Sequence, residues 1–240
     1  MMKGIIEARQ LSTGYGKKIV LKDQNIVIPK NKITVILGPN GCGKSTMLKT
    51  MARVLPLKDG KIILDGKDLK TMKTAEIAQK IGFLSQILNT PEGISVYELV
   101  SYGRYPYKRI SSTKEDQKII EWALKETQTF EIKDMLVHDL SGGQKQRVWI
   151  AMVLAQQTNT ILLDEPTTYL DIGHQLEVLE LLSKLNKEEQ QTIVMVLHDI
   201  NHASHYSDWI IAMKEGKVFK EGSPKDIITS EVIQELYGVK

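Results

Sequence analysis

The chain of 240 residues has little that would suit an exported, membrane-spanning or strongly charged protein. Its single cysteine, Cys42, excludes a disulfide within the chain and is typical of a reducing compartment. The longest uninterrupted apolar run, residues 148–155, is far shorter than the ~20 residues that cross a bilayer as a helix. Glu7 and Arg9 interrupt the start, so no export signal is expected. The net charge of +3, without long blocks of one sign, gives no support to nucleic-acid binding.

The sequence does contain enough apolar residues for a sizeable core, with 42% hydrophobic and 25% charged residues. Short apolar runs bounded by turn residues alternate with stretches at helical spacing, which predicts an α/β fold with a largely parallel sheet. The expected strands are Ile33–Leu37, Ile81–Leu84, Thr160–Leu163 and Thr192–Leu197, and the expected helices beside them are Lys44–Val54 and Gly173–Asn186.

Two hairpins are predicted from their turn residues. Lys61–Leu64 runs into Asp65-Gly66, and the segments 209–213 and 217–220 flank Glu215-Gly216. Ser223-Pro224 predicts a capped helix start.

Residues 86–157 differ from the rest because they contain helical spacing and no strand-like run. The predicted helices are Val96–Tyr102, Lys114–Thr127 and Gln144–Gln157. We therefore expect one domain, 1–240, in which a helical lobe (86–157) is inserted into a core lobe formed by residues 1–85 and 158–240.

The clearest motif is the phosphate loop, residues 38–45, which reads Gly38-Pro39-Asn40-Gly41-Cys42-Gly43-Lys44-Ser45 and satisfies G-x-x-x-x-G-K-[ST]. It lies between a predicted strand and a predicted helix, so backbone N–H groups and the helix N-terminus would surround phosphate oxygens. Lys44 would then bridge the β- and γ-phosphates and Ser45 would bind magnesium. The alternative is a glycine-rich turn that caps a helix, with Lys44 in solvent. We interpret Cys42 as a small filler, with a reactive thiol as the alternative.

Two carboxylates end the predicted strand 160–163. Asp164 suits a magnesium ion, and Glu165 can serve as the general base on an attacking water. The alternative is that both carboxylates cap the next helix.

A second anion site is predicted at Leu140-Ser141-Gly142-Gly143-Gln144. Ser141 can cap a helix that begins at Gly142, with Gln144 completing a capping box, while the glycines let a phosphate approach backbone donors. The alternative is an ordinary helix cap.

Together these motifs resemble those of ATP-binding cassette (ABC) ATPases, in the family's order and over essentially the whole chain. The resemblance implies a P-loop NTPase (RecA-like) core with a mostly parallel sheet, an N-terminal antiparallel β subdomain and an inserted α-helical subdomain. It implies that MgATP is bound by Tyr15 on the adenine, by the phosphate loop with Thr46, and by Gln86, which senses magnesium and water. It also implies that His198 reaches the γ-phosphate and joins Glu165, Gln86 and Lys44 in catalysis. The run 167–171 departs slightly from the commoner form of the loop in which Asp171 contacts a second subunit.

In the family, two subunits bind two nucleotides head to tail. The resemblance therefore implies a homodimer in which Ser141, Gly142, Gly143 and Gln144 of one copy close over the phosphates held by the other.

Three longer segments, 103–106, 149–156 and 198–208, resemble the ATPase subunits of bacterial ferric-siderophore and cobalamin importers. This implies a peripheral subunit on the cytoplasmic face of the membrane, with a separate permease and an extracytoplasmic siderophore-binding protein as partners and no nucleic acid. We favour an iron(III)-siderophore as the substrate; cobalamin, haem and other metal chelates are the alternatives.

Some features stay open at this point. Residues 102–109 alternate aromatic and basic side chains, which fits a groove edge that meets the permease, an ordinary polar loop or a single-stranded nucleic-acid contact. His198, His202 and His205 would share one helical face, although we expect no metal there. A DNA-maintenance ATPase is a remote rival, because the 95 residues between Lys44 and Leu140 lack heptads and paired cysteines. A nucleotide sensor without turnover is another, against which the presence of Glu165 argues.

Overall fold

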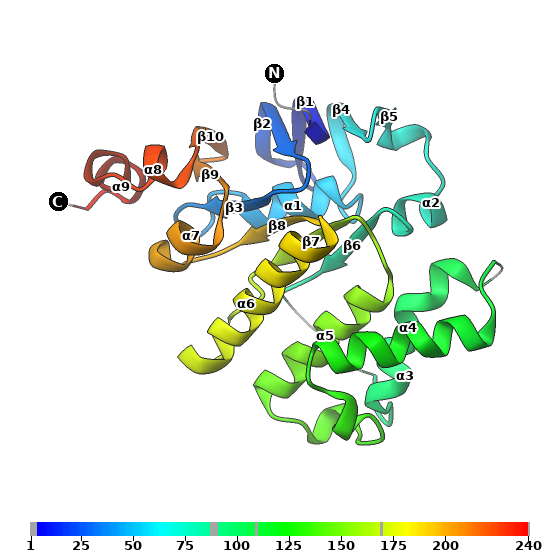
Figure 1. The fold of residues 1–240 in the computed structure, drawn as a ribbon. Helices are drawn as coiled ribbons and strands as arrows, with labels where there is room; N and C mark the ends of the chain where they lie inside the picture. The colour runs from blue at the N-terminus through cyan, green and yellow to red at the C-terminus, as the bar shows by residue number, and fades with distance from the viewer. Residues whose placement is uncertain (1–3, 87–90, 109, 169, 240) are drawn as a thin grey trace.

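Two β-sheets lie on opposite sides of one helix in the computed structural model, which describes residues 4–86, 91–108, 110–168 and 170–239 (Figure 1). The first sheet is antiparallel, in the order β2-β1-β4-β5, and consists of β1 (Gly4–Tyr15), β2 (Lys18–Pro29), β4 (Leu57–Leu64) and β5 (Lys67–Asp68). The second has the order β10-β9-β3-β8-β7-β6 and consists of β3 (Ile33–Leu37), β6 (Ile81–Leu84), β7 (Thr160–Asp164), β8 (Thr192–Val196), β9 (Trp209–Lys214) and β10 (Lys217–Gly222). Apart from the antiparallel β9–β10 pair, its strands are parallel, so the expected fold class is confirmed.

The central strands are buried on both faces, and the alternation of their side chains decides which core each residue enters. In β3, Val35 packs on the face toward the long helices, whereas Ile36 packs toward the antiparallel sheet. The helix α1 (Lys44–Met51) fills the space between the two sheets with Met47, Leu48 and Met51, all fully buried. This packing fixes the N-terminus of α1 at the end of the phosphate loop.

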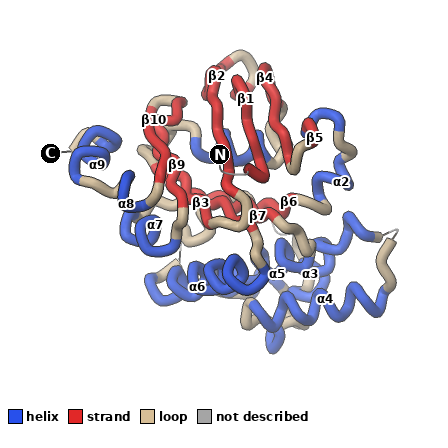
Figure 2. The backbone as a smooth tube through the Cα atoms, turned by 45° about the horizontal axis from the view of Figure 1, so that its top comes forward, coloured by secondary structure: helices blue, strands red, loops and turns tan. Residues whose placement is uncertain are grey.

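The other face of the second sheet is covered by helices (Figures 1 and 2). They include α3 (Val96–Ser101), α4 (Thr113–Glu126), α5 (Gly142–Ala155) and α6 (Ile172–Glu189), which confirm the expected helices to within a few residues. The other helical segments of the described residues are α2 (Thr74–Ala78), α7 (Ile200–Tyr206), α8 (Pro224–Ile227), α9 (Ser230–Tyr237) and the 3-10 turns η1 (Leu69–Thr71), η2 (Tyr102–Tyr107), η3 (Phe130–Ile132) and η4 (Val137–Asp139). Helices α3, α4 and α5 share one apolar core with the sheet.

Both predicted hairpins are present. Asp65 and Gly66 have φ values of 50° and 80°, and Glu215 and Gly216 have 50° and 75°, as a two-residue turn between right-twisted strands requires. None of the helices in the described ranges is long and apolar enough to cross a bilayer.

Candidate functional site

The predicted site residues meet at one edge of the parallel sheet. The phosphate loop follows β3, Gln86 follows β6, Glu165 follows β7 and His198 follows β8, and these four strands are neighbours in the order β3-β8-β7-β6. Because the carboxyl ends of parallel strands lie along the same edge, segments far apart in the sequence come together there.

A cavity of about 510 Å³ opens at this edge. Its size is in the range of small-molecule sites. It is lined by Tyr15, Lys18, Val20, Asn40, Gly41, Gly43, Lys44, Ser45, Thr46, Gln86, Glu165 and His198. Ten of these residues were predicted to bind nucleotide or to act in catalysis, whereas Lys18 and Val20 of β2 were not.

The phosphate loop adopts a backbone that glycine makes accessible. Gly43 precedes α1 with φ of 104°, and a Cβ at this position would lie 2.7 Å from Cδ2 of Leu21. Lys44 is buried, and its Nζ donates to the carbonyls of Gly38 at 2.7 Å and Pro39 at 3.0 Å. The ammonium group is therefore already held against the loop at the N-terminus of α1, where the helix dipole favours an anion.

Asp164 and Ser45 form the oxygen pair expected for a magnesium ion. Asp164 has the same parity in β7 as Leu162, so it points toward α1, and the Ser45 hydroxyl donates to its Oδ1 at 2.7 Å. The other carboxylate oxygen, Oδ2, is buried without a hydrogen-bond partner among the described residues, and Lys49 Nζ is 3.8 Å from it. Burial raises the pKa of Asp164, partly offset by the Ser45 hydrogen bond. A free carboxylate oxygen beside a serine hydroxyl fits Mg²⁺, which prefers oxygen ligands.

Three polar side chains contact the carboxylate of Glu165. Its Oε2 accepts from Gln86 Nε2 at 2.7 Å and from the Thr168 hydroxyl at 2.9 Å, while its Oε1 lies 2.7 Å from His198 Nε2. Its backbone has φ of 55°, a left-handed conformation that a non-glycine residue adopts only at a cost of roughly 1 kcal/mol. The turn aims the carboxylate at the cavity.

The prediction that His198, His202 and His205 share one helical face is wrong. Helix α7 begins at Ile200 with Asp199 as its N-cap, so His198 lies before the helix and points to Glu165. The backbone N–H groups of Asn201 and His202 donate to the Asp199 carboxylate. The helix therefore starts after His198, and His198 shares no helical face with His202. No cluster of three metal-ligating side chains is found within the described ranges.

The predicted capping box at Ser141 is present, as both the predicted anion site and an ordinary helix cap require. Ser141 caps α5 by accepting from the Gln144 N–H at 3.3 Å, and its own N–H donates to Gln144 Oε1 at 3.0 Å. Asp171 caps α6 through His174, whose ring lies 3.3 Å from where a Cβ of Gly143 would stand. Asp171 and Gly143 thus lie on one exposed surface, and neither they nor Ser141, Gly142 and Gln144 line the cavity of the same chain.

Not every residue of the phosphate loop lines the cavity. Gly38, Pro39 and Cys42 do not line it, and Cys42 is 4% exposed in the core between the two sheets. Burial raises the pKa of the Cys42 thiol, with Lys44 opposing the shift. This packing fits the filler interpretation of Cys42 and disfavours a reactive thiol.

The family model for "ABC transporter" matches residues 21–168, which is more than half of the chain. The chain belongs to the ABC transporter family. It is 49% identical to the iron(3+)-hydroxamate import ATP-binding protein FhuC of Bacillus subtilis, over 98% of this chain and 88% of that protein. It is 46% identical to the ferric enterobactin transport ATP-binding protein FepC of Escherichia coli, over 98% and 88%. Among solved structures, it resembles the dimeric post-hydrolysis state of the ATP-binding cassette MJ0796 bound to ADP and Pi, with a TM-score of 0.82, 31% identity, and coverage of 91% of this chain and 98% of that one.

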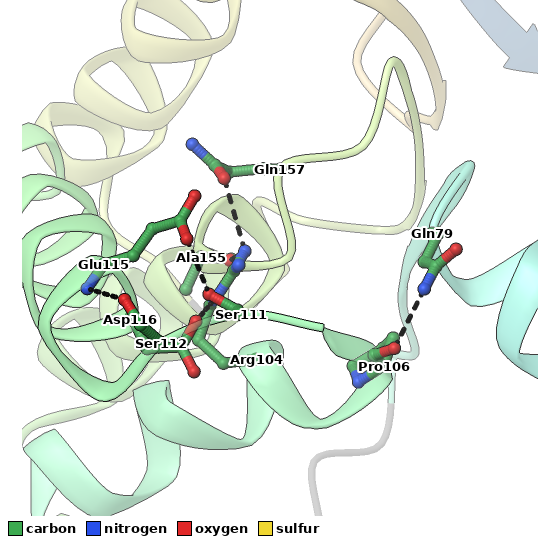
Figure 3. Close-up of polar contacts among 9 residues, drawn as sticks. All are labelled: Gln79, Arg104, Pro106, Ser111, Ser112, Glu115, Asp116, Ala155 and Gln157. Carbon is green, nitrogen blue, oxygen red and sulfur yellow. Dashed lines mark hydrogen bonds and ion pairs between the residues drawn. The ribbon is translucent and has the colours of Figure 1, made fainter. Parts of the chain in front are cut away.

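Within residues 102–109 of this ABC chain, for which the sequence left several functions open, Arg104 has a structural role. Arg104 in η2 is 5% exposed, and its guanidinium donates to Asp116 at 2.7 Å and to the carbonyl of Ala155 at 2.9 Å (Figure 3). It also lies 4.2 Å from the centre of the Tyr107 ring. Arg104 therefore fixes η2 to α4 and α5, and its charge is not free to bind a partner. Arg109, another basic residue of the run 102–109, lies outside the described residues. Tyr102 and Tyr105 of the same ABC segment are exposed.

Proposed function

We propose that this chain is the ATP-hydrolysing subunit of an importer for iron(III)-siderophores. The observation that carries the proposal is the arrangement of Glu165, Gln86 and His198 over a cavity that also holds Lys44 and the Ser45–Asp164 pair. A base, two polar side chains, a phosphate-binding lysine and a magnesium-binding oxygen pair are the parts that hydrolysis of a nucleoside triphosphate needs.

ATP binding is assigned to the cavity and its loop. Tyr15 stacks on the adenine, and the phosphate loop, residues 38–45, surrounds the phosphates together with Thr46 through its backbone N–H groups, of which Pro39 supplies none. Lys44 exchanges its loop carbonyls for phosphate oxygens, which keeps its buried charge paired.

The proposed chemistry is an in-line attack of water on the γ-phosphate. Glu165 accepts the proton of the water, and His198 and Gln86 orient the γ-phosphate and the water. Ser45, Asp164 and Gln86 would hold Mg²⁺, which would neutralise charge on the phosphates. Asp164 would serve as the carboxylate, through Oδ2, which has no hydrogen-bond partner among the described residues.

A second copy of the chain completes each site. Ser141, Gly142 and Asp171 are exposed, and Gly143 and Gln144 are half-buried. None of the five lines its own chain's cavity, which supports a role on the nucleotide of the partner. In this scheme residues 1–85 and 158–240 form the nucleotide-binding lobe, and 86–157 form the helical lobe that carries the signature motif. ATP favours the closed pair, and loss of a phosphate contact on hydrolysis reopens it.

The transport role follows from the named relatives. Iron(3+)-hydroxamate and ferric enterobactin transport appear in the names of FhuC and FepC, at 49% and 46% identity over nearly the full chain. We assign the chain to the cytoplasmic face of the membrane, as a peripheral subunit of a separate permease fed by an extracytoplasmic siderophore-binding protein. The exposed Tyr102 and Tyr105 suit the edge that meets the permease.

The test of the enzyme assignment is Glu165→Gln. We expect this variant to bind ATP as the wild type does and to hydrolyse it about 10²- to 10⁴-fold more slowly, because the amide cannot accept the proton. Phosphate release and titration with a fluorescent ATP analogue measure the two properties, and Glu188→Gln, at an exposed position on α6, is the matched control. Unchanged hydrolysis in Glu165→Gln would remove Glu165 as the base.

The substrate assignment is tested by growth. A strain without this chain is expected to lose growth on at least one iron(III)-siderophore supplied as the sole iron source and to regain it with the wild-type chain. Normal growth of the deletion strain on every siderophore, with loss of cobalamin-dependent growth, would overturn the iron assignment.

A further inference from the structure

Thr168 and Glu165 belong to one tight turn at the end of β7. The Thr168 N–H donates to the Glu165 carbonyl at 3.3 Å, which closes the turn around the left-handed φ of 55° at Glu165. The Thr168 hydroxyl donates to Oε2 of the same glutamate at 2.9 Å. Thr168 therefore restrains both the main chain and the carboxylate of Glu165.

The two other side chains that contact Glu165 come from different strands. Gln86 follows β6 and His198 follows β8, each 2.7 Å from a carboxylate oxygen, and both line the cavity. A side chain that turns toward bound MgATP gives up its contact with Glu165. Thr168 is not among the residues lining the cavity, and it stays with Glu165 because the turn carries both.

We propose that Thr168 is a positioning residue for ATP hydrolysis, whose hydroxyl holds Oε2 of Glu165 and leaves Oε1 to the attacking water. The inference rests on the proposed function, in which Glu165 is the base. Thr168 itself transfers no proton and contacts no nucleotide. A glutamate side chain samples several rotamers when it is not restrained, so losing this bond lowers the fraction of molecules in the reactive geometry.

The test compares three variants of the full chain in steady-state ATP hydrolysis. Thr168→Val replaces the hydroxyl by a methyl group, Thr168→Ser keeps the hydroxyl, and Thr113→Val is the control at an exposed threonine of α4. We expect Thr168→Val to lower kcat about tenfold with KM for ATP changed by less than about twofold. Thr168→Ser is expected to restore kcat to within about threefold of the wild type, and Thr113→Val to match the wild type.

A double-mutant cycle separates positioning from a general structural effect. In single-turnover measurements, Thr168→Val is expected to cause no further loss in a chain that already carries Glu165→Gln, because the carboxylate that Thr168 restrains is gone. If Thr168→Val does not fold by thermal melting, Thr168→Ala removes the same hydroxyl and takes its place.

The proposal is overturned by wild-type kcat in the variant that lacks the hydroxyl, by a loss that serine does not restore, or by an additive loss in the cycle. Wild-type turnover in Glu165→Gln alone is a different failure, because it overturns the base assignment on which the role of Thr168 rests.

Discussion

Lys44 is the residue whose contribution to nucleotide affinity we expect to be the simplest to measure, because it carries a buried charge. Its Nζ has two loop carbonyls as partners and lies at the N-terminus of α1, a region of positive potential. A phosphate oxygen satisfies that charge better than a carbonyl does, because both partners are then ionised.

We predict that Lys44→Met weakens ATP binding about ten- to hundredfold, the loss expected for one charge-assisted hydrogen bond. The methionine keeps much of the apolar stem, so a thermal melt should show a folded chain. Titration with a fluorescent ATP analogue measures the affinity, and Lys30→Met, at an exposed position, is the control. An unchanged Kd in Lys44→Met would contradict the assignment of the phosphate loop.

The sequence predicted most of the site at this scale, for physical reasons that differ among residues. The Ser45–Asp164 pair follows from strand parity and from the loop–helix junction, both of which are visible in the residue pattern. Thr168 was missed because its hydroxyl reaches Glu165 only through a left-handed turn, and no residue type at 165 indicates such a turn. Lys18 was missed because it reaches the cavity through its pairing with Tyr15 across the β1–β2 hairpin.

Arg104 links η2 to the helices α4 and α5. Its guanidinium bridges η2, α4 and the end of α5, while Gln79 in the core lobe donates to the carbonyl of Pro106 at 2.9 Å (Figure 3). Arg104 thereby connects the segment with exposed tyrosines to the helix that carries Ser141 at its other end.

We predict that Asp116→Asn lowers the free energy of unfolding by about 2 kcal/mol at pH 7, because the buried Arg104 loses its counter-ion. Desolvation alone would raise the pKa of Asp116, but hydrogen bonds from Arg104 and Ser111 and the charge of Arg104 together lower it. A lowered folded-state pKa means that this stabilisation is complete above the unfolded value of about 4 and is lost as the pH falls through the folded value.

The difference between wild type and Asp116→Asn should therefore shrink below about pH 4. Urea unfolding at pH 7 and pH 3 measures it, with Asp134→Asn, at an exposed position, expected to stay within about 0.5 kcal/mol of the wild type at both. A difference that stays constant between the two pH values would show that the ion pair is not its cause.

How well each strand or helix was predicted depends on how clear its hydrophobic pattern is in the sequence. Strands β3, β7 and β8 are continuous apolar runs beside glycine or acidic residues, and they were found almost to the residue. The bounds of β1 and β2 were not predicted, because register shifts and the left-handed Gln10 and Asp23 break their period-two pattern. Helix α1 ends at Met51, before the expected Val54, since Arg53 takes φ of 57°.

At the scale of the whole molecule, one chain carries two half-sites that do not meet. The cavity with the phosphate loop lies at the edge of the parallel sheet, and Ser141 and Asp171 lie on a separate exposed surface. In the head-to-tail pair of chains that we propose, each half meets the other across two nucleotides. Such a complex would depend on ATP, because the phosphates would supply contacts to both copies.

The most direct test is the mass in solution of the Glu165→Gln chain with and without saturating MgATP, measured by light scattering after size exclusion. We predict a monomer of 27.1 kDa without nucleotide and a dimer of about twice that mass with it, since the variant binds ATP without hydrolysing it. Ser141→Arg in the same background should bind ATP and stay monomeric, because Ser141 does not line its own chain's cavity. A Glu165→Gln chain that stays monomeric at saturating MgATP, alone and on its permease, would contradict the account.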